Sequence, residues 1–152
     1  MMKMMLLVVG VVIAAMSGVT VYQNLTPPNN LGLHHGRLAA LASTPNGVSS
    51  MADNSDKRVE PLNFKADLKA TQLAALRAFA HMPNNQIIER NERYVHAVFF
   101  SPRMGFRDDV ELYFDQQNQV LHYRSQSRVG YSDMGVNKQR YQRFAELYAE
   151  AP

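Results

Sequence analysis

Residues 106–125 read FRDDVELYFDQQNQVLHYRS, two strand patterns joined by a short polar turn. In the first strand, Phe106–Asp115, apolar and polar side chains alternate, which is typical of a β-strand with one face in the core. Its apolar side chains are Val110, Leu112 and Phe114. The second strand, Gln119–Ser125, follows after a short turn, so the two strands are expected to pair antiparallel.

Two further strand patterns and a helix pattern precede this pair. Gln86–Arg90 and Arg93–Ser101 are predicted strands, and the second is rich in aromatic and β-branched residues. Asp67–Met82 has the spacing of an amphipathic helix that ends at a Pro-Asn-Asn turn. Val59–Phe64 is a candidate short strand, which Pro61 would confine to a sheet edge. The predicted apolar stripe of the helix is Leu68, Leu73, Leu76, Phe79 and Ala80.

A second helix pattern, Asn137–Ala149, closes the chain, and its predicted stripe is Tyr141, Phe144, Ala145 and Tyr148. The order strand–helix–four strands–helix predicts an α+β fold, with an antiparallel sheet of four to five strands and both helices on one face. Asp109 and Glu111 would then lie on the opposite, more open face. TATA-binding-protein-like and helix-grip domains have the same order, an analogy that carries no function.

Residues 1–22 form a predicted N-terminal membrane anchor or signal segment. The stretch of residues 4–22, Met4–Tyr22, carries no charge. As a helix with a rise of about 1.5 Å per residue it would span about 28 Å, close to the thickness of the roughly 30 Å hydrocarbon layer. Lys3 is the only charged side chain before it, so the domain is expected on the extracytoplasmic side. A signal peptide cleaved after Ser17 and a buried core helix are the alternatives; the apolar run exceeds the usual ~7–15-residue signal core, which favours the anchor.

Residues 23–30 contain two prolines and three asparagines and are a predicted linker, and residues 31–152 are a predicted single α+β domain. Within that domain, residues 31–41 are expected to be a short helical or irregular approach and residues 43–50 a loop. The absence of cysteine excludes disulfides, thiolate zinc sites and cysteine nucleophiles. The net charge of +3 comes from basic residues interleaved with acids, so nucleic-acid binding is not expected. The expected membrane partner is contacted through residues 4–22.

The densest set of polar groups lies in Arg124–Arg140, RSQSRVGYSDMGVNKQR, between the last strand and the last helix. Guanidinium groups, hydroxyls and the free N–H groups of a helix N-terminus can together bind a phosphate or carboxylate, so this stretch predicts a corner that binds a small anionic ligand. The alternative is an internal network in which the arginines pair with acidic residues. The predicted ligand-binding residues are Arg124, Ser125, Ser127, Arg128, Asp133, Asn137, Arg140, Asp108, Asp109, Glu111, Asn46 and Ser49.

Asp109 and Glu111 share one strand face, about 6–7 Å apart. Two carboxylates at that spacing can serve a hydrolase as acid and base or bind a hard cation, whereas the alternative interpretation makes them ion-pair partners of the arginines. No EF-hand spacing and no HxH or HxxxH spacing occurs, so we predict no metal, no cofactor and no catalytic residue. The leading hypothesis is a non-enzymatic binding or envelope-associated module, with a hydrolase or a structural domain as alternatives.

Three patches occur in a fixed order: PNGVSS at residues 45–50, FRDDVE at residues 106–111, and the stretch Arg124–Arg140. Together they closely resemble the family called domain of unknown function 1499, over roughly Leu31 to Tyr148. Members are commonly membrane-anchored or exported, which the resemblance implies here too, and no biochemical activity comes with it. Members often carry cysteines around the first patch, where this chain has Gly47.

Overall fold

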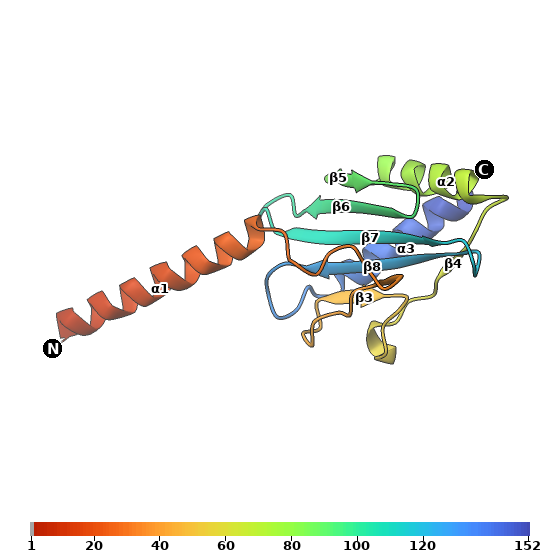
Figure 1. Ribbon diagram of the computed structural model, residues 1–152. Coiled ribbons are helices and arrows are strands. Elements are labelled where there is room, and N and C mark those ends of the chain that lie inside the picture. Colours follow the sequence, from red (N-terminus) through yellow and green to blue (C-terminus); the bar gives the residue numbers. More distant parts are fainter. Residues whose placement is uncertain (1) are drawn as a thin grey trace.

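The structure is a computed structural model that describes residues 2–152 and is an α+β fold, as predicted. Figure 1 shows a long N-terminal helix that projects from one end of a sheet, with two further helices packed on one sheet face. The elements are α1 (Met2–Leu25), β1 (Leu33–His34), β2 (Arg37–Leu38), β3 (Gly47–Ser49), the 3-10 turn η1 (Ser55–Lys57), β4 (Leu62–Asn63), α2 (Leu68–Ala80), β5 (Asn85–Arg90), β6 (Tyr94–Phe100), β7 (Arg107–Asp115), β8 (Val120–Ser127) and α3 (Val136–Glu150).

The main sheet has six strands, in the order β3-β8-β7-β6-β5 with β4 also paired to β8, and these strands pair antiparallel. An isolated parallel bridge joins Ser49 to Arg58. Strands β5 to β8 correspond to the four predicted strands, and they pair with one another in sequence order. Strand β8 runs to Ser127, two residues further than the predicted strand. The strand expected at Val59–Phe64 shortens to β4, which begins directly after Pro61.

Strand β3 lies where a loop was expected. It pairs with β8 so that Gly47 faces Gln126 and Ser49 faces Arg124. A Cβ atom at Gly47 would come within 2.8 Å of the Ser125 carbonyl oxygen, so the close approach of the two strands depends on glycine at this position.

The core lies between the sheet and the helices α2 and α3. Phe144 of α3 is fully buried, and its ring centroid lies 5.1 Å from that of Phe79 and 5.4 Å from that of Tyr123. The predicted stripe of α2 is partly wrong, because Leu73 is 48% exposed and Ala80 is exposed. The buried face of α2 is instead formed by small residues and one aromatic ring: Thr71, Ala74, Ala75, Ala78 and Phe79.

The sheet face opposite the helices is less open than expected. Residues 31–41, where a short helical or irregular approach was expected, contain the β1–β2 hairpin. Leu38 of this hairpin packs with Tyr94 and Tyr113 in a second, smaller core. The side chain of Glu111, which was expected on an open face, is fully buried beneath this cover. Leu33 and Met51 complete the cover at its edges.

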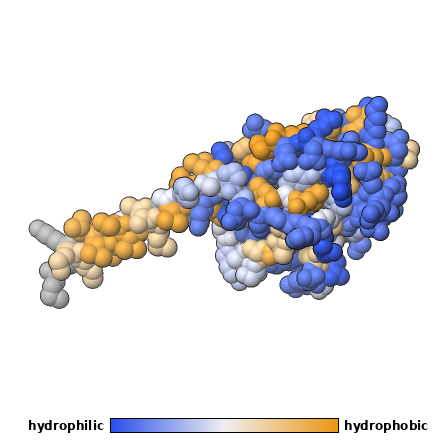
Figure 2. All heavy atoms as spheres, in the orientation of Figure 1, coloured by the Kyte–Doolittle hydropathy of each residue, from blue (hydrophilic) through white to orange (hydrophobic). Residues whose placement is uncertain are grey.

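Helix α1 is long and apolar enough in its stretch Met4–Leu25 to cross a membrane, and none of that stretch is buried by the rest of the protein. Figure 2 shows its hydrophobic surface extending from the domain. A secretion signal near the N-terminus can meet the same criteria of length and composition, so helix α1 fits either a membrane anchor or a signal sequence. The helix continues to Leu25, three residues into the segment predicted as a linker.

Candidate functional site

Two buried ion pairs join β7 and β8 on the face under the β1–β2 hairpin. Glu111 and Arg124 lie directly opposite each other in the strand register, with Arg124 Nη1 2.5 Å from Glu111 Oε2. Arg128 Nε and Nη2 donate to the two carboxylate oxygens of Asp109, each at 2.8 Å. A planar guanidinium that meets a carboxylate with two parallel hydrogen bonds is a strong and directional pair.

Each carboxylate also accepts hydrogen bonds from other elements. Glu111 Oε1 accepts from the Tyr94 hydroxyl at 2.7 Å and from the Gly32 backbone N–H at 2.8 Å. Asp109 Oδ1 lies 2.8 Å from His96 Nε2. Both carboxylates are therefore saturated by partners within the chain, which a buried charge requires.

These contacts shift the pKa values of two of the groups. Burial raises the pKa of the Asp109 carboxyl, but the hydrogen bonds from Arg128 and His96 outweigh burial and bring the pKa below its ordinary value of 3.8. Burial, followed by the nearby Glu111 carboxylate, raises the pKa of the Tyr94 phenol far above its ordinary value. Tyr94 therefore stays protonated and donates to Glu111.

Arg128 also ties this network to the end of α1. Its Nη1 donates to the carbonyl oxygens of Asn24 at 3.2 Å and Leu25 at 3.4 Å, so a cation sits at the negative C-terminal end of the helix. The Asn24 side chain bonds in two directions, donating to the Gly105 carbonyl at 2.9 Å and accepting from the Arg107 N–H at 2.8 Å. We call these contacts of Asn24, Leu25, Gly105, Arg107 and Arg128 the helix joint.

A second polar network lies on the opposite face of the same two strands. Arg140 Nη2 donates to Asp108 Oδ2 at 2.6 Å, and the guanidinium carbon lies 4.8 Å from the centre of the Phe99 ring. Arg140 Nη1 donates to the Asn137 side-chain oxygen at 2.5 Å. The Asn137 amide in turn donates to the Asn46 carbonyl oxygen at 3.0 Å. This network attaches the N-terminal turn of α3 to β3 and β8.

The predicted ligand-binding residues therefore fall into two groups rather than one corner. Successive side chains of a strand point to opposite faces, and β8 continues through Ser127, so neighbours in sequence separate. The group under the hairpin is Asp109, Glu111, Arg124 and Arg128, and the group under α3 is Asn46, Asp108, Ser125, Ser127, Asn137 and Arg140.

Two predicted residues join neither group. The Asp133 carboxylate accepts the backbone N–H of Asn137 at 2.7 Å and of Gly135 at 3.1 Å, so it occupies the free donors at the start of α3. Ser49 is buried, and its hydroxyl accepts the N–H of Met51 at 3.1 Å in a local turn.

Eight residues of the networks under the hairpin and at the helix joint were not among the predicted site residues: Asn24, Leu25, Gly32, Tyr94, His96, Gly105, Arg107 and Gln126. Tyr94 and His96 could have been predicted from the sequence, because they lie two residues apart on β6, the strand next to the one that carries Asp109 and Glu111. Gly32 could not have been predicted, since its backbone N–H reaches Glu111 only because of the path of a loop in which Gly32 has φ +95.

A cavity of about 180 Å³ lies beside the ion pairs, lined by Pro28, Asn30, Asp109, Arg124, Gln126, Ser127 and Arg128. It is large enough for a few waters or a small polar molecule. The Arg124 Nε atom is buried and has no hydrogen-bond partner. Within residues 2–152, no cluster of three or more metal-binding side chains occurs.

Removing one partner of the Glu111–Arg124 pair should destabilise the domain strongly, because it leaves a buried charge uncompensated. We expect Glu111→Gln and Arg124→Met each to cost about 3–5 kcal/mol of unfolding free energy. The double variant should cost less than the sum of the two. Chemical denaturation of the four proteins measures this coupling.

The matched control is the Arg143–Glu146 pair on α3, whose atoms approach to 3.1 Å while both side chains stay more than half exposed. Arg143→Met and Glu146→Gln should each change stability far less, since exposed pairs contribute roughly 0.2–1 kcal/mol. Equal costs for the buried and the exposed pair would show that Glu111 and Arg124 are not coupled as described.

The Asp109–Arg128 pair should make stability depend on acid pH. The folded-state pKa of Asp109 lies below 3.8, so its charge stabilises the fold above that pH, and the contribution is lost as pH falls through the lowered pKa. The gap in unfolding free energy between wild type and Asp109→Asn should therefore shrink as pH is lowered from 7 to below 3.8. Asp53→Asn, at an exposed carboxylate, is the control. A gap that stays constant over this range would refute the assignment.

Comparison with known proteins gives one match. The family described as "Protein of unknown function (DUF1499)" matches residues 37–147, which include both networks except for the segment before residue 37. No curated protein and no solved structure matches the chain. The match covers well over half of the sequence, and the chain belongs to the DUF1499 family of proteins of unknown function.

Proposed function

We propose that this protein is a membrane-anchored, non-enzymatic module of the cell envelope whose domain lies on the extracytoplasmic side. The observation that carries the proposal is the helix joint, in which Arg128 bonds both to Asp109 and to the last carbonyl groups of α1. The buried ion pairs thus hold the domain at a defined position on the end of an apolar helix. Lys3 precedes the apolar stretch Met4–Leu25, and no further charged residue follows until Arg37, which favours an N-terminus in the cytoplasm.

An anchor accounts for the exposed surface of α1 better than a cleaved signal does. Cleavage after Ser17 would leave the last turns of the helix on the domain, with the large side chains of Val19, Val21, Tyr22 and Leu25 each more than half exposed to water. In a membrane the same side chains lie in or next to the hydrocarbon layer. Retention of the full helix is therefore the arrangement that leaves the least apolar surface in water.

The hydrolase alternative loses its support at the carboxylates. A general base must be free to take a proton from a substrate or a water molecule. Asp109 is engaged by Arg128 and His96, and Glu111 is fully buried and engaged by Arg124. These carboxylates are placed to hold arginines and not to reach a substrate.

The anchor and the orientation are tested together in cells. The intact mass of the membrane-extracted protein should be that of the complete 152-residue chain. A C-terminal reporter enzyme that is active only outside the cytoplasm should be active. Loss of the first 17 residues would refute the anchor. The orientation would be refuted if this reporter were inactive while a C-terminal reporter that works only in the cytoplasm were active.

A small anionic ligand in the cavity beside Arg124 and Arg128 is a second candidate function. The cavity has both guanidinium groups in its wall and lies under Pro28 and Asn30 of the segment after α1. Two carboxylates already pair with the two arginines, so a ligand of one or few charges fits this site better than a polyanion.

Inorganic phosphate is the probe for this second function. If phosphate binds, a concentration of 100 times Kd should stabilise the detergent-purified full chain by about 2.7 kcal/mol, or roughly 5–10 °C in Tm, relative to chloride at equal ionic strength. Asn30→Trp, which adds an indole at an exposed position of the cavity wall, should abolish the shift. Equal Tm values in phosphate and chloride would refute phosphate binding in this cavity, and the ion pairs of Arg124 and Arg128 would then have a structural role only.

A further inference from the structure

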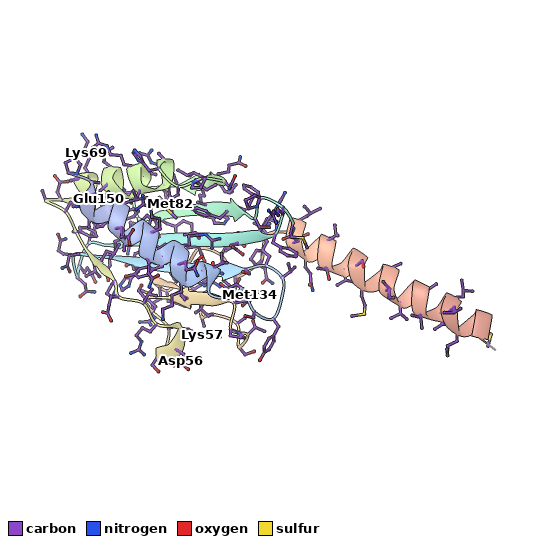
Figure 3. All side chains as sticks on the ribbon, turned by 180° about the vertical axis from the view of Figure 1, so that it is seen from behind. Asp56, Lys57, Lys69, Met82, Met134 and Glu150 are labelled. Carbon is purple, nitrogen blue, oxygen red and sulfur yellow. The ribbon has the colours of Figure 1, made fainter. Side chains whose placement is uncertain are left out.

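Two loops at the end of the domain next to α1 carry most of its exposed apolar side chains. The loops are residues 101–106, between β6 and β7, and residues 128–135, between β8 and α3; we call them the tip loops. Figure 1 shows both loops at the end of the sheet from which α1 projects. In Figure 3, Met134 lies at this end, whereas Lys69 and Glu150 lie at the far end of the domain.

The apolar side chains are concentrated rather than scattered. Outside α1, the domain exposes Leu73, Ile87, Ile88, Met104, Phe106, Tyr131, Met134 and Val136 as large apolar residues. The last five belong to the tip loops or to the residue directly after them, and Met134 is 91% exposed. Grouped exposed apolar side chains on a small domain mark a surface that contacts another apolar phase.

The helix joint sets the height of the tip loops relative to a bilayer. The apolar stretch Met4–Leu25 would be about 33 Å long at about 1.5 Å per residue, slightly more than the roughly 30 Å hydrocarbon layer. Leu25 therefore lies at the membrane surface. Asn24 bonds to the backbone of Gly105 and Arg107, so the first tip loop is held at the same level.

A cavity of about 220 Å³ extends this contact toward the membrane. Its wall includes Thr20 of α1, Phe106 of the first tip loop, Val129 of the second tip loop, and Val136. Thr20 precedes Asn24 by one helical turn and so lies closer to the centre of the bilayer. The cavity thus opens between the helix and the domain, at the depth where lipid headgroups meet acyl chains.

We propose that the tip loops rest in the interfacial layer of the bilayer that α1 crosses, and that its lipids are the partner of this surface. The proposal rests on the anchor proposed above and adds a second, side-on membrane contact. Continuity favours lipid over a protein partner, because the same cavity wall joins Thr20 of α1 to Phe106 and Val129 of the tip loops. Tyr131 and the exposed Arg103 supply the aromatic ring and the cation that suit the headgroup layer.

The chain has no cysteine, so single-cysteine labelling reports one position at a time. The test places an environment-sensitive fluorophore on Met104→Cys or Met134→Cys in the full chain. The protein is reconstituted in phosphatidylcholine and phosphatidylglycerol vesicles whose acyl chains are brominated near the headgroup. We expect both labels to lose most of their fluorescence to brominated lipid and to be protected from aqueous iodide.

Three control positions give the comparison. Gln117→Cys lies on the exposed β7–β8 turn, and Ile88→Cys is an exposed apolar position on β5; both labels should be quenched by iodide and not by lipid. Ile13→Cys in α1 should be protected from iodide. Labels at 104 and 134 that behave like the label at 117, while the label at 13 is protected, would overturn the lipid contact and leave the anchor intact.

Two other outcomes also decide the question. If the label at 13 is open to iodide, the anchor fails, and the lipid contact fails with it. If the labels at 104 and 134 are protected in native membranes but exposed in pure lipid vesicles, the surface binds a protein and the lipid assignment is wrong.

Discussion

The structure depends on two arginine–carboxylate pairs that are buried between the sheet and the N-terminal segment. Glu111 is fully buried, and an isolated charge there would be prohibitively unfavourable, so every oxygen needs a partner. The partners come from the whole chain: Arg124 on β8, Tyr94 on β6 and Gly32 before β1. The segment after α1 is therefore part of the fold, because the sheet needs it to complete the environment of a buried charge.

Polar networks on both faces of β7 and β8 also constrain strand register. Arg124 and Glu111 face each other under the hairpin, while Ser125 and Asp108 belong to the network under α3. A slip of one residue in either strand would send its side chains to the opposite face and place Arg124 against the apolar core. Such a slip would break both networks at once, which makes the alternative pairing far less stable than the observed one.

The features that sequence patterns predict here are those that repeat along the chain. Alternation in β7 and helical spacing in α3 suffice for the meander and the closing helix, and the α+β class follows. The strands β1 to β4 have two or three residues each, too few to show the alternation of apolar and polar side chains by which a strand is predicted. Strand β3 also depends on a close contact at Gly47. Leu73 shows that helical spacing does not always predict which face of a helix is buried, since α2 buries a face rich in alanine and leaves this leucine exposed. The carboxylates and arginines that pair in the two networks were predicted and His96 was not, and the placement of Ser127 and Arg128 required the true end of β8.

The helix joint fixes α1 on the domain, where a flexible linker would leave the two free to move. Residues 26–30 between α1 and the domain, fully extended, would reach about 17 Å and would let the domain move freely above a membrane. Instead, Arg128 contacts the last carbonyl groups of α1, and Asn24 contacts the first tip loop. The C-terminal end of α1 is therefore bound directly to the domain. In the proposed orientation, the buried charge that stabilises the domain is also the charge that sets its distance from the lipid. Loss of the Asp109–Arg128 pair would thus loosen the contact between the domain and α1 as well as weaken the core, because one guanidinium group serves both contacts.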